Sequence, residues 1–146
     1  MMTIIKREAV VPFTAQQMYE LVNDVASYPS FLPYCQGSTV LKQSDNEVHA
    51  SLTLAKGVFS KSFTTCNRLQ PGKMIEVVLV DGPFRHLEGF WRFQDKVEGG
   101  SEIKLDLEFE LAGGFLNKAF EPVFAQVANK LVDAFHHRAK DVYGTK

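Results

Sequence analysis

Apolar and polar residues alternate loosely from Ile4 to Val11, a stretch rich in β-branched side chains, and this pattern predicts a strand. Pro12 should end the strand, because proline lacks the N–H group that a sheet ladder needs. Thr14 and Gln17 have the spacing of a capping box, which marks the start of a helix. The apolar residues that follow recur at helical spacing, so we expect a helix from about Ala15 to Asp24.

The segment 28–35, with the sequence YPSFLPYC, combines two prolines with several large side chains. Pro29 and Pro33 exclude a long regular helix, so we expect at most a short helix and a turn. The aromatic density is unusual for a solvated loop, and the large side chains should therefore either cap the core or line a cavity. These side chains are those of Tyr28, Phe31, Leu32 and Tyr34.

From Ser38 to Leu111 the apolar pattern changes to a period of two residues, which is typical of strands. Turn signals at 45–46, 56–57, 71–72, 81–83 and 98–100 divide this stretch into six strands, and such tight turns join antiparallel neighbours. The last strand alternates most clearly, with apolar residues at the odd positions 103–111 and mostly acidic residues between them. We expect these acidic side chains on a solvent-exposed face and not in a metal site.

After the pair Gly113-Gly114, apolar residues recur at spacings of mainly three and four. This predicts a helix from about Phe115 to Val142, which would be about 42 Å long at 1.5 Å per residue. Pro122 lies inside it, so we expect a kink or a broken first turn near 118–121. The whole order predicts an α+β helix-grip fold, with a curved antiparallel sheet of about seven strands around the long helix and one or two short helices after the first strand.

Composition and charge agree with one folded domain. Hydrophobic residues make up 45% of the 146 residues and charged residues 23%, which is ordinary for a soluble protein. The net charge of −1 lacks the basic excess of most DNA-binding domains, so we expect no DNA partner. No stretch approaches the roughly 20 apolar residues of a spanning helix, and the first residues do not resemble a signal peptide. We therefore expect a cytoplasmic protein.

Recognisable catalytic and metal-binding motifs are absent from the sequence. Cys35 and Cys66 match neither a CxxC pair nor a multi-cysteine zinc site, so we expect reduced thiols that pack against neighbours. We predict no catalytic residue and no metal site. The histidines are expected at surface or edge positions, and they are His49, His86, His136 and His137.

Apolar side chains are in surplus on the elements that would surround a space between the sheet and the long helix. They include Phe84, the single tryptophan Trp91, and the long-helix residues Phe120, Phe124 and Val127. Aromatic residues at helical spacing usually form core, so the pattern alone favours a filled core. The alternative is an apolar cavity for a hydrophobic small molecule, with a few polar contacts. The candidates for those contacts are Asn23, Tyr28 and Tyr34.

Four stretches of the sequence carry a resemblance to a known family. They are MYELVNDVASYPSFLPYC at 18–35, FTTCNRL at 63–69, LVDGPFRHLEGFWRF at 79–93 and AFEPVFAQVANKLVDAFHHRAKDVY at 119–143. Together they resemble the bacterial RatA and coenzyme Q-binding protein family of the START-like, polyketide-cyclase-related superfamily. Because the resemblance covers nearly the whole chain in order, it implies a single START-like domain over residues 1–146.

The resemblance implies two functions. Members related to mitochondrial coenzyme Q-binding proteins bind ubiquinone between sheet and helix and support respiration as carriers or chaperones. Here it implies ubiquinone or another isoprenoid quinone as ligand, no covalent cofactor, and transient contact with the inner membrane face. Family motifs often have a small residue where Tyr34 stands, so this side chain could narrow the entrance. The residues at motif positions, implied to lie at the pocket mouth or wall, are Tyr28, Pro29, Phe31, Leu32, Pro33, the turn Asp81 to Phe84, and Trp91.

Other bacterial members are described as ribosome association toxins, which bind the large ribosomal subunit and block its joining to the small one. This interpretation implies an antitoxin partner and requires basic side chains for phosphate contacts. A cyclase or hydrolase, suggested by the superfamily name alone, is least favoured because the sequence shows no acid, base or nucleophile constellation. Quinone binding and ribosome binding both stay open and are not exclusive. The candidates for ribosome contacts are Lys56, Lys61, Arg68, Lys73 and Arg85.

Overall fold

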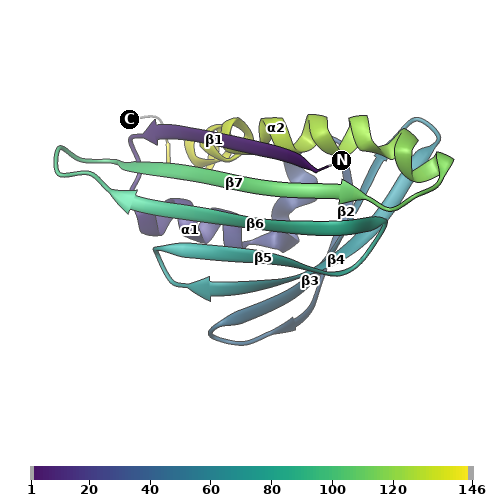
Figure 1. Cartoon of the computed structure of the whole chain (residues 1–146). Coiled ribbons are helices and arrows are strands. Elements are labelled where there is room, and N and C mark those ends of the chain that lie inside the picture. The colour runs from purple at the N-terminus through teal and green to yellow at the C-terminus, as the bar shows by residue number, and fades with distance from the viewer. Residues whose placement is uncertain (1, 145–146) are drawn as a thin grey trace.

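The computed structural model describes residues 2–144 as a curved seven-stranded sheet with both α-helices on one side (Figure 1). Each of the six strands expected between Ser38 and Leu111 is present, and the α+β helix-grip prediction is confirmed. The elements in order are β1 (Thr3–Val11), α1 (Ala15–Asn23), the 3₁₀ helix η1 (Val25–Ser30), β2 (Cys35–Gln43), β3 (Glu47–Lys56), β4 (Phe59–Gln70), β5 (Met74–Asp81), β6 (Phe84–Asp95), β7 (Ser101–Leu111) and α2 (Phe115–Tyr143).

The sheet is antiparallel throughout, with the strand order β1-β7-β6-β5-β4-β3-β2. Strands β2 to β7 follow one another as a meander, whereas β1 returns from the start of the chain to pair with β7. Helix α2 contacts β1 and β7 at one end of this order and β3 and β4 at the other. The sheet therefore curves around the helix, and the core lies in the space that this curvature encloses.

Helix α1 begins with the capping box expected from the sequence. The Gln17 backbone N–H donates to the Thr14 hydroxyl at 3.0 Å, and the Thr14 N–H donates to the Gln17 side-chain oxygen at 2.9 Å. The Asp95 carboxylate of β6 accepts a further hydrogen bond from the Ala15 N–H at 2.8 Å. Because these contacts satisfy the free N–H groups of the first turn, they stabilise the helix start and tie it to the sheet.

A kink or a broken first turn was expected near 118–121, and helix α2 stays helical through Pro122, so the broken turn is not formed. Proline removes the hydrogen bond that would reach back to Lys118. Both residues are exposed, so water can solvate the freed carbonyl oxygen. Within residues 2–144, neither helix combines the length and apolar character that crossing a membrane requires.

The two faces of the sheet differ in chemistry. On β7 the apolar residues at odd positions from Ile103 to Leu111 are buried, while the polar residues between them are not. The opposite face carries ion pairs such as Arg92 with Asp106 at 3.0 Å. The alternation predicted from the sequence therefore holds, and it directs apolar side chains toward α2.

Candidate functional site

A cavity of about 100 Å³ lies between the concave face of the sheet and α2. Its walls come from η1, from strands β3 to β7 and from the middle of α2, and they are mostly apolar. The helix wall consists of Phe124, Val127, Ala128, Leu131 and Phe135. The space between sheet and helix is thus neither completely filled by side chains nor widely open.

One aromatic cluster, here called the Phe124 cluster, closes the cavity toward the start of α2. Phe124 lies at ring-centroid distances of 4.7 Å from Phe109 and 4.9 Å from Phe84, and at larger distances from Phe63 and Phe120. Most of these pairs are edge-to-face, an arrangement that aromatic rings favour.

A second group, here called the Phe135 cluster, closes the other side. Phe135 lies 5.4 Å from Tyr28, 5.2 Å from Phe31 and 5.4 Å from Trp91, again edge-to-face. Phe124 and Phe135 are about 16 Å apart along the helix. The cavity-lining residues between them on α2 have smaller side chains, so the cavity is the space that these side chains leave between two aromatic clusters.

Two polar side chains, Thr65 and Asn67 on β4, interrupt the apolar wall. They are only 7% and 8% exposed because they alternate inward together with Phe63 and Leu69. The Thr65 hydroxyl donates to Asn67 Oδ1 at 2.9 Å. In the described part of the chain no group accepts a hydrogen bond from Asn67 Nδ2. The amide N–H groups of Asn67 are therefore available to an acceptor inside the cavity.

Tyr28 lines the cavity with its ring but does not offer its hydroxyl. That hydroxyl donates to the backbone carbonyl of Val22, and burial, followed by the charges of Asp24 and Cys35, raises the pKa of Tyr28 far above its ordinary value. The other two polar candidates, Asn23 and Tyr34, lie outside the lining. Among the lining residues, Asn67 thus offers the polar group that was expected from these three residues.

Five of the predicted ligand-binding residues line the cavity: Tyr28, Leu32, Trp91, Phe124 and Val127. The other six do not, because they pack within the aromatic clusters or face solvent. Phe84 and Phe120 belong to the Phe124 cluster and Phe31 to the Phe135 cluster, where the Arg138 guanidinium covers its ring at 5.1 Å. Pro29 in η1 and Asp81 at the end of β5 are exposed, and Pro33 in the turn before β2 is half-buried.

Several lining residues were not predicted from the sequence, most importantly Thr65, Asn67 and Phe135. A signal for the polar pair was present, because the two-residue period that buries Phe63 and Leu69 also turns Thr65 and Asn67 inward. Two polar residues in an inward-facing row need hydrogen-bond partners, which can come from each other, from the surrounding core or from a ligand.

The five basic candidates for ribosome contacts do not form one cluster. Lys56 and Lys61 lie near the β3–β4 turn, and Lys56 Nζ donates to Gln126 of α2 at 3.4 Å. Lys73 follows the other end of β4, about 36 Å away at the usual rise per strand residue. Arg68 pairs with Glu76 at 3.4 Å on the outer face of the sheet, and Arg85 lies 3.9 Å from Glu110.

Two groups of potential metal ligands, which were not predicted from the sequence, lie on the outer face of the sheet. In each group one ligand atom per residue lies within 4.8 Å of the others. The groups are Glu47, His49 and Cys66, and His86, Glu88 and Glu108.

The histidines were expected at surface or edge positions. This prediction holds for the exposed His137, whereas His136 is half-buried beside Phe13 at a ring-centroid distance of 6.4 Å.

Residues 11–136 match the family model described as polyketide cyclase / dehydrase and lipid transport. The chain is 47% identical over 144 residues to a ribosome association toxin RatA from Pseudomonas aeruginosa, covering 99% of this chain and 100% of that protein. It is 28% identical over 139 residues to a mitochondrial coenzyme Q-binding protein homolog from Xenopus laevis, covering 92% of this chain and 57% of that protein.

A solved aromatase/cyclase from Streptomyces sp. R1128 superposes with a TM-score of 0.82 over 96% of this chain and 94% of the other. The identity of that pair is 16%, so the likeness shows the fold alone.

Proposed function

Because the chain belongs to the polyketide cyclase, dehydrase and lipid transport family, and to the group of its RatA-named relatives, we propose that it binds a hydrophobic small molecule without catalysis, most specifically an isoprenoid quinone such as ubiquinone. The observation that carries this proposal is that the amide N–H groups of Asn67 have no acceptor among the described residues, in a buried wall that is mostly apolar. A quinone matches this wall, because its ring carbonyls accept hydrogen bonds while its tail is entirely apolar.

The size of the cavity defines how such a ligand binds. Its volume of about 100 Å³ is below the roughly 300 to 1,000 Å³ of pockets for drug-sized ligands, though near the about 150 Å³ of an engineered cavity that holds benzene. A head group therefore enters when the side chains between the two aromatic clusters move apart. The tail extends beyond this space and is held by burial of apolar surface, at about 25 cal/mol per Å².

The chemistry of the lining supports binding over catalysis. The described residues that line the cavity include no carboxylate, histidine, lysine or cysteine. The Tyr28 hydroxyl is occupied by Val22, and the Thr65 hydroxyl is occupied by Asn67. General acid–base catalysis needs a group that exchanges a proton with the ligand near neutral pH, and this lining supplies none of the usual ones.

Native mass spectrometry with lipid extraction tests the proposal on protein purified from a ubiquinone-producing bacterium. We expect copurified ubiquinone at near-stoichiometric amounts. Asn67→Leu should weaken uptake roughly tenfold, because one buried hydrogen bond is worth about 1 kcal/mol or slightly more. Thr64→Val is the matched control, since Thr64 lies on the same strand and alternates to the outer face. Wild-type protein that neither retains nor takes up ubiquinone contradicts the proposal.

A second candidate function is association with the large ribosomal subunit, which blocks subunit joining. The observation that favours it is the 47% identity, over nearly both full lengths, to a protein named for ribosome association. Lys56 and Lys61 are the best-placed contacts, because they lie close together at one end of the sheet beside α2.

Cosedimentation with purified large subunits at low and high salt tests this second function. We expect binding that falls steeply with salt, because released counterions drive phosphate contacts. The double variant Lys56→Glu and Lys61→Glu should lose binding, while Lys73→Glu at the far end of β4 should keep it. Absence of wild-type cosedimentation at about 50 mM salt, where phosphate contacts are strong, rejects this function.

A further inference from the structure

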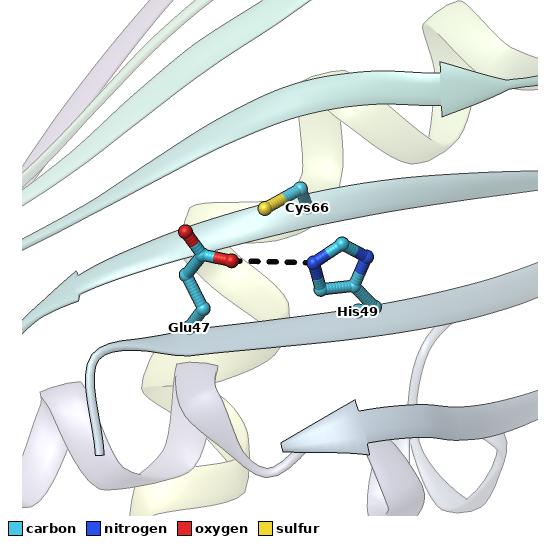
Figure 2. A group of neighbouring side chains, drawn as sticks. All are labelled: Glu47, His49 and Cys66. Carbon is cyan, nitrogen blue, oxygen red and sulfur yellow. Dashed lines mark hydrogen bonds and ion pairs between the residues drawn. The ribbon is translucent and has the colours of Figure 1, made fainter. Parts of the chain in front are cut away.

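Three side chains with metal-ligating atoms meet on the outer face of the sheet, on the side of β4 opposite to the cavity (Figure 2). Glu47 and His49 are two residues apart on β3, so their side chains point to the same face. Cys66 lies directly across from His49 in the β3–β4 register. Figure 2 shows the carboxylate, the imidazole and the thiol converging from the two strands.

The spacing of these atoms is close to that of a tetrahedral metal site. His49 Nε2 and Glu47 Oε1 are 3.3 Å apart, and Cys66 Sγ lies within 4.8 Å of one ligand atom of each residue. Nitrogen and oxygen ligands at about 2.0 to 2.1 Å from Zn²⁺ lie about 3.3 Å from each other, and a sulfur at about 2.3 Å lies about 3.6 Å from either. A shift of the sulfur by less than about 2 Å therefore completes the geometry.

The charges of the cluster suit a divalent cation. The Glu47 carboxylate, 3.3 Å from the His49 ring nitrogen, supplies one negative charge. The Cys66 sulfur supplies a second one when a metal ion displaces the thiol proton. A carboxylate, a thiolate and a neutral imidazole carry two negative charges together, which balance those of the ion. The nearby Arg68 pairs with Glu76 at 3.4 Å.

We propose that Glu47, His49 and Cys66 bind Zn²⁺ through one oxygen, one nitrogen and one sulfur, with a fourth position open to water or to a ligand from a partner. Thiolate, imidazole and carboxylate together favour zinc over Mg²⁺ or Ca²⁺, which prefer oxygen ligands alone. Cys66 lies between Thr65 and Asn67 in the chain, so the ion holds the strand segment that presents the polar pair to the cavity. The site is separate from the quinone site and does not depend on it.

Cobalt(II) is the spectroscopic probe for this site, because it replaces zinc and its thiolate complexes absorb in the near ultraviolet. We expect chelator-treated wild-type protein to give this charge-transfer band with one Co²⁺ per chain, and Zn²⁺ to abolish it. Cys66→Ala should lose the band. His49→Ala should weaken Co²⁺ binding by more than the roughly 10- to 100-fold that changes outside the ligand set cost.

Two variants are matched controls. Cys35→Ala removes the other thiol, and His86→Ala disrupts the second cluster, which contains no sulfur. Both should keep the band. A wild-type protein without the band, or a Cys66→Ala variant that retains it, overturns the proposal.

Alkylation of the wild-type thiols decides the question if Cys66→Ala fails to fold. With peptide mass spectrometry as the readout, Zn²⁺ should slow the modification of Cys66 at least tenfold and leave the buried Cys35 unchanged, because a metal-bound thiolate is shielded. Binding should also release about one proton per chain at neutral pH. Equal alkylation of Cys66 with and without Zn²⁺ overturns the proposal.

Discussion

The Phe124 cluster and the Phe135 cluster use the same ring chemistry on the same helix, but they are anchored differently. Phe124 packs against rings from strands β4, β6 and β7, which the sheet ladder holds. Phe135 packs against Tyr28 of η1 and against Phe31, which directly follows that element. Among the aromatic rings of the described residues, Trp91 alone contacts the Phe135 ring from the sheet.

This difference indicates which side of the cavity can open. Helix η1 is a 3₁₀ helix of 6 residues that packs on β2, where Ser38 Oγ donates to the Val25 carbonyl at 2.8 Å, and it is not itself part of the sheet ladder. Local segments with few ladder hydrogen bonds open at lower free-energy cost than strands inside a sheet. A ligand should therefore enter beside the Phe135 cluster, while the Phe124 cluster stays closed.

The largest effect should follow from Phe120→Ala. Phe120 has 0% exposure and lies outside the cavity lining, so its removal creates a new void and should lower the free energy of unfolding by about 3 to 5 kcal/mol. Phe115→Ala is the control on the same helix, because Phe115 is 84% exposed and its loss should change stability by under about 0.5 kcal/mol. Urea denaturation measures the free energy of unfolding of both variants. Equal losses of stability would contradict the tight packing of Phe120 in the Phe124 cluster.

Trp91→Ala should lower the free energy of unfolding by less than Phe120→Ala does, although tryptophan is the larger residue. One side of Trp91 already faces the cavity, so we expect a loss of about 2 to 3 kcal/mol, together with weaker quinone retention. Paired denaturation and lipid-extraction measurements separate the two effects. A stability loss as large as that of Phe120→Ala would mean that the Phe135 cluster is packed as tightly as the Phe124 cluster.

Tyr28→Phe tests the attachment of η1. The change keeps the ring but leaves the Val22 carbonyl without its donor, so the free energy of unfolding should fall by about 1 kcal/mol. Amide hydrogen exchange in η1 should accelerate more than exchange in β4. Tyr34→Phe is the matched control, because among the described residues its hydroxyl has no hydrogen-bond partner. Unchanged exchange in η1 would argue against entry at this side.

The smallest expected effect is a dependence of stability on pH that comes from His136, the residue that follows Phe135. Burial, followed by the charge of Lys140, lowers the pKa of His136 below its ordinary value of 6.5. The unfolded chain therefore takes up a proton before the folded protein does, and the free energy of unfolding should fall as pH drops through about 6.5. His136→Gln should flatten this slope, measured by urea denaturation between pH 8 and 5, whereas His137→Gln at an exposed position should not. A slope that His136→Gln leaves unchanged would assign the effect to other groups.

Local pattern predicted the elements well because each pattern depends on residues close together in the chain. The capping box of Thr14 and Gln17 predicted the start of α1, and the alternation from Ile103 to Leu111 predicted β7 with its buried face. The unbroken first turn of α2 departs from the prediction, because Pro122 and Lys118 lie where water replaces the lost hydrogen bond.

The candidate site followed from the sequence only in part. Trp91 was predicted from an apolar-rich segment and a family motif, and it does line the cavity, whereas Phe84, near a register shift of the same strand, turns into the Phe124 cluster. Asn67 was overlooked, although its inward position could be counted from Phe63. Whether the amide N–H groups of Asn67 have an acceptor depends on the surrounding side chains, which come from distant parts of the chain.

The sequence by itself determined the order of the elements, the inward and outward face of each strand, and the family to which the chain belongs. Periodicity, turn residues and motifs are properties of neighbouring positions, so no tertiary contact is needed to recognise them. Only the tertiary structure decided that a cavity remains between two aromatic clusters, that Lys56 and Lys73 lie far apart, and that Cys66 meets Glu47 and His49. These features depend on sheet curvature and on the register between strands, which join residues that the sequence keeps apart.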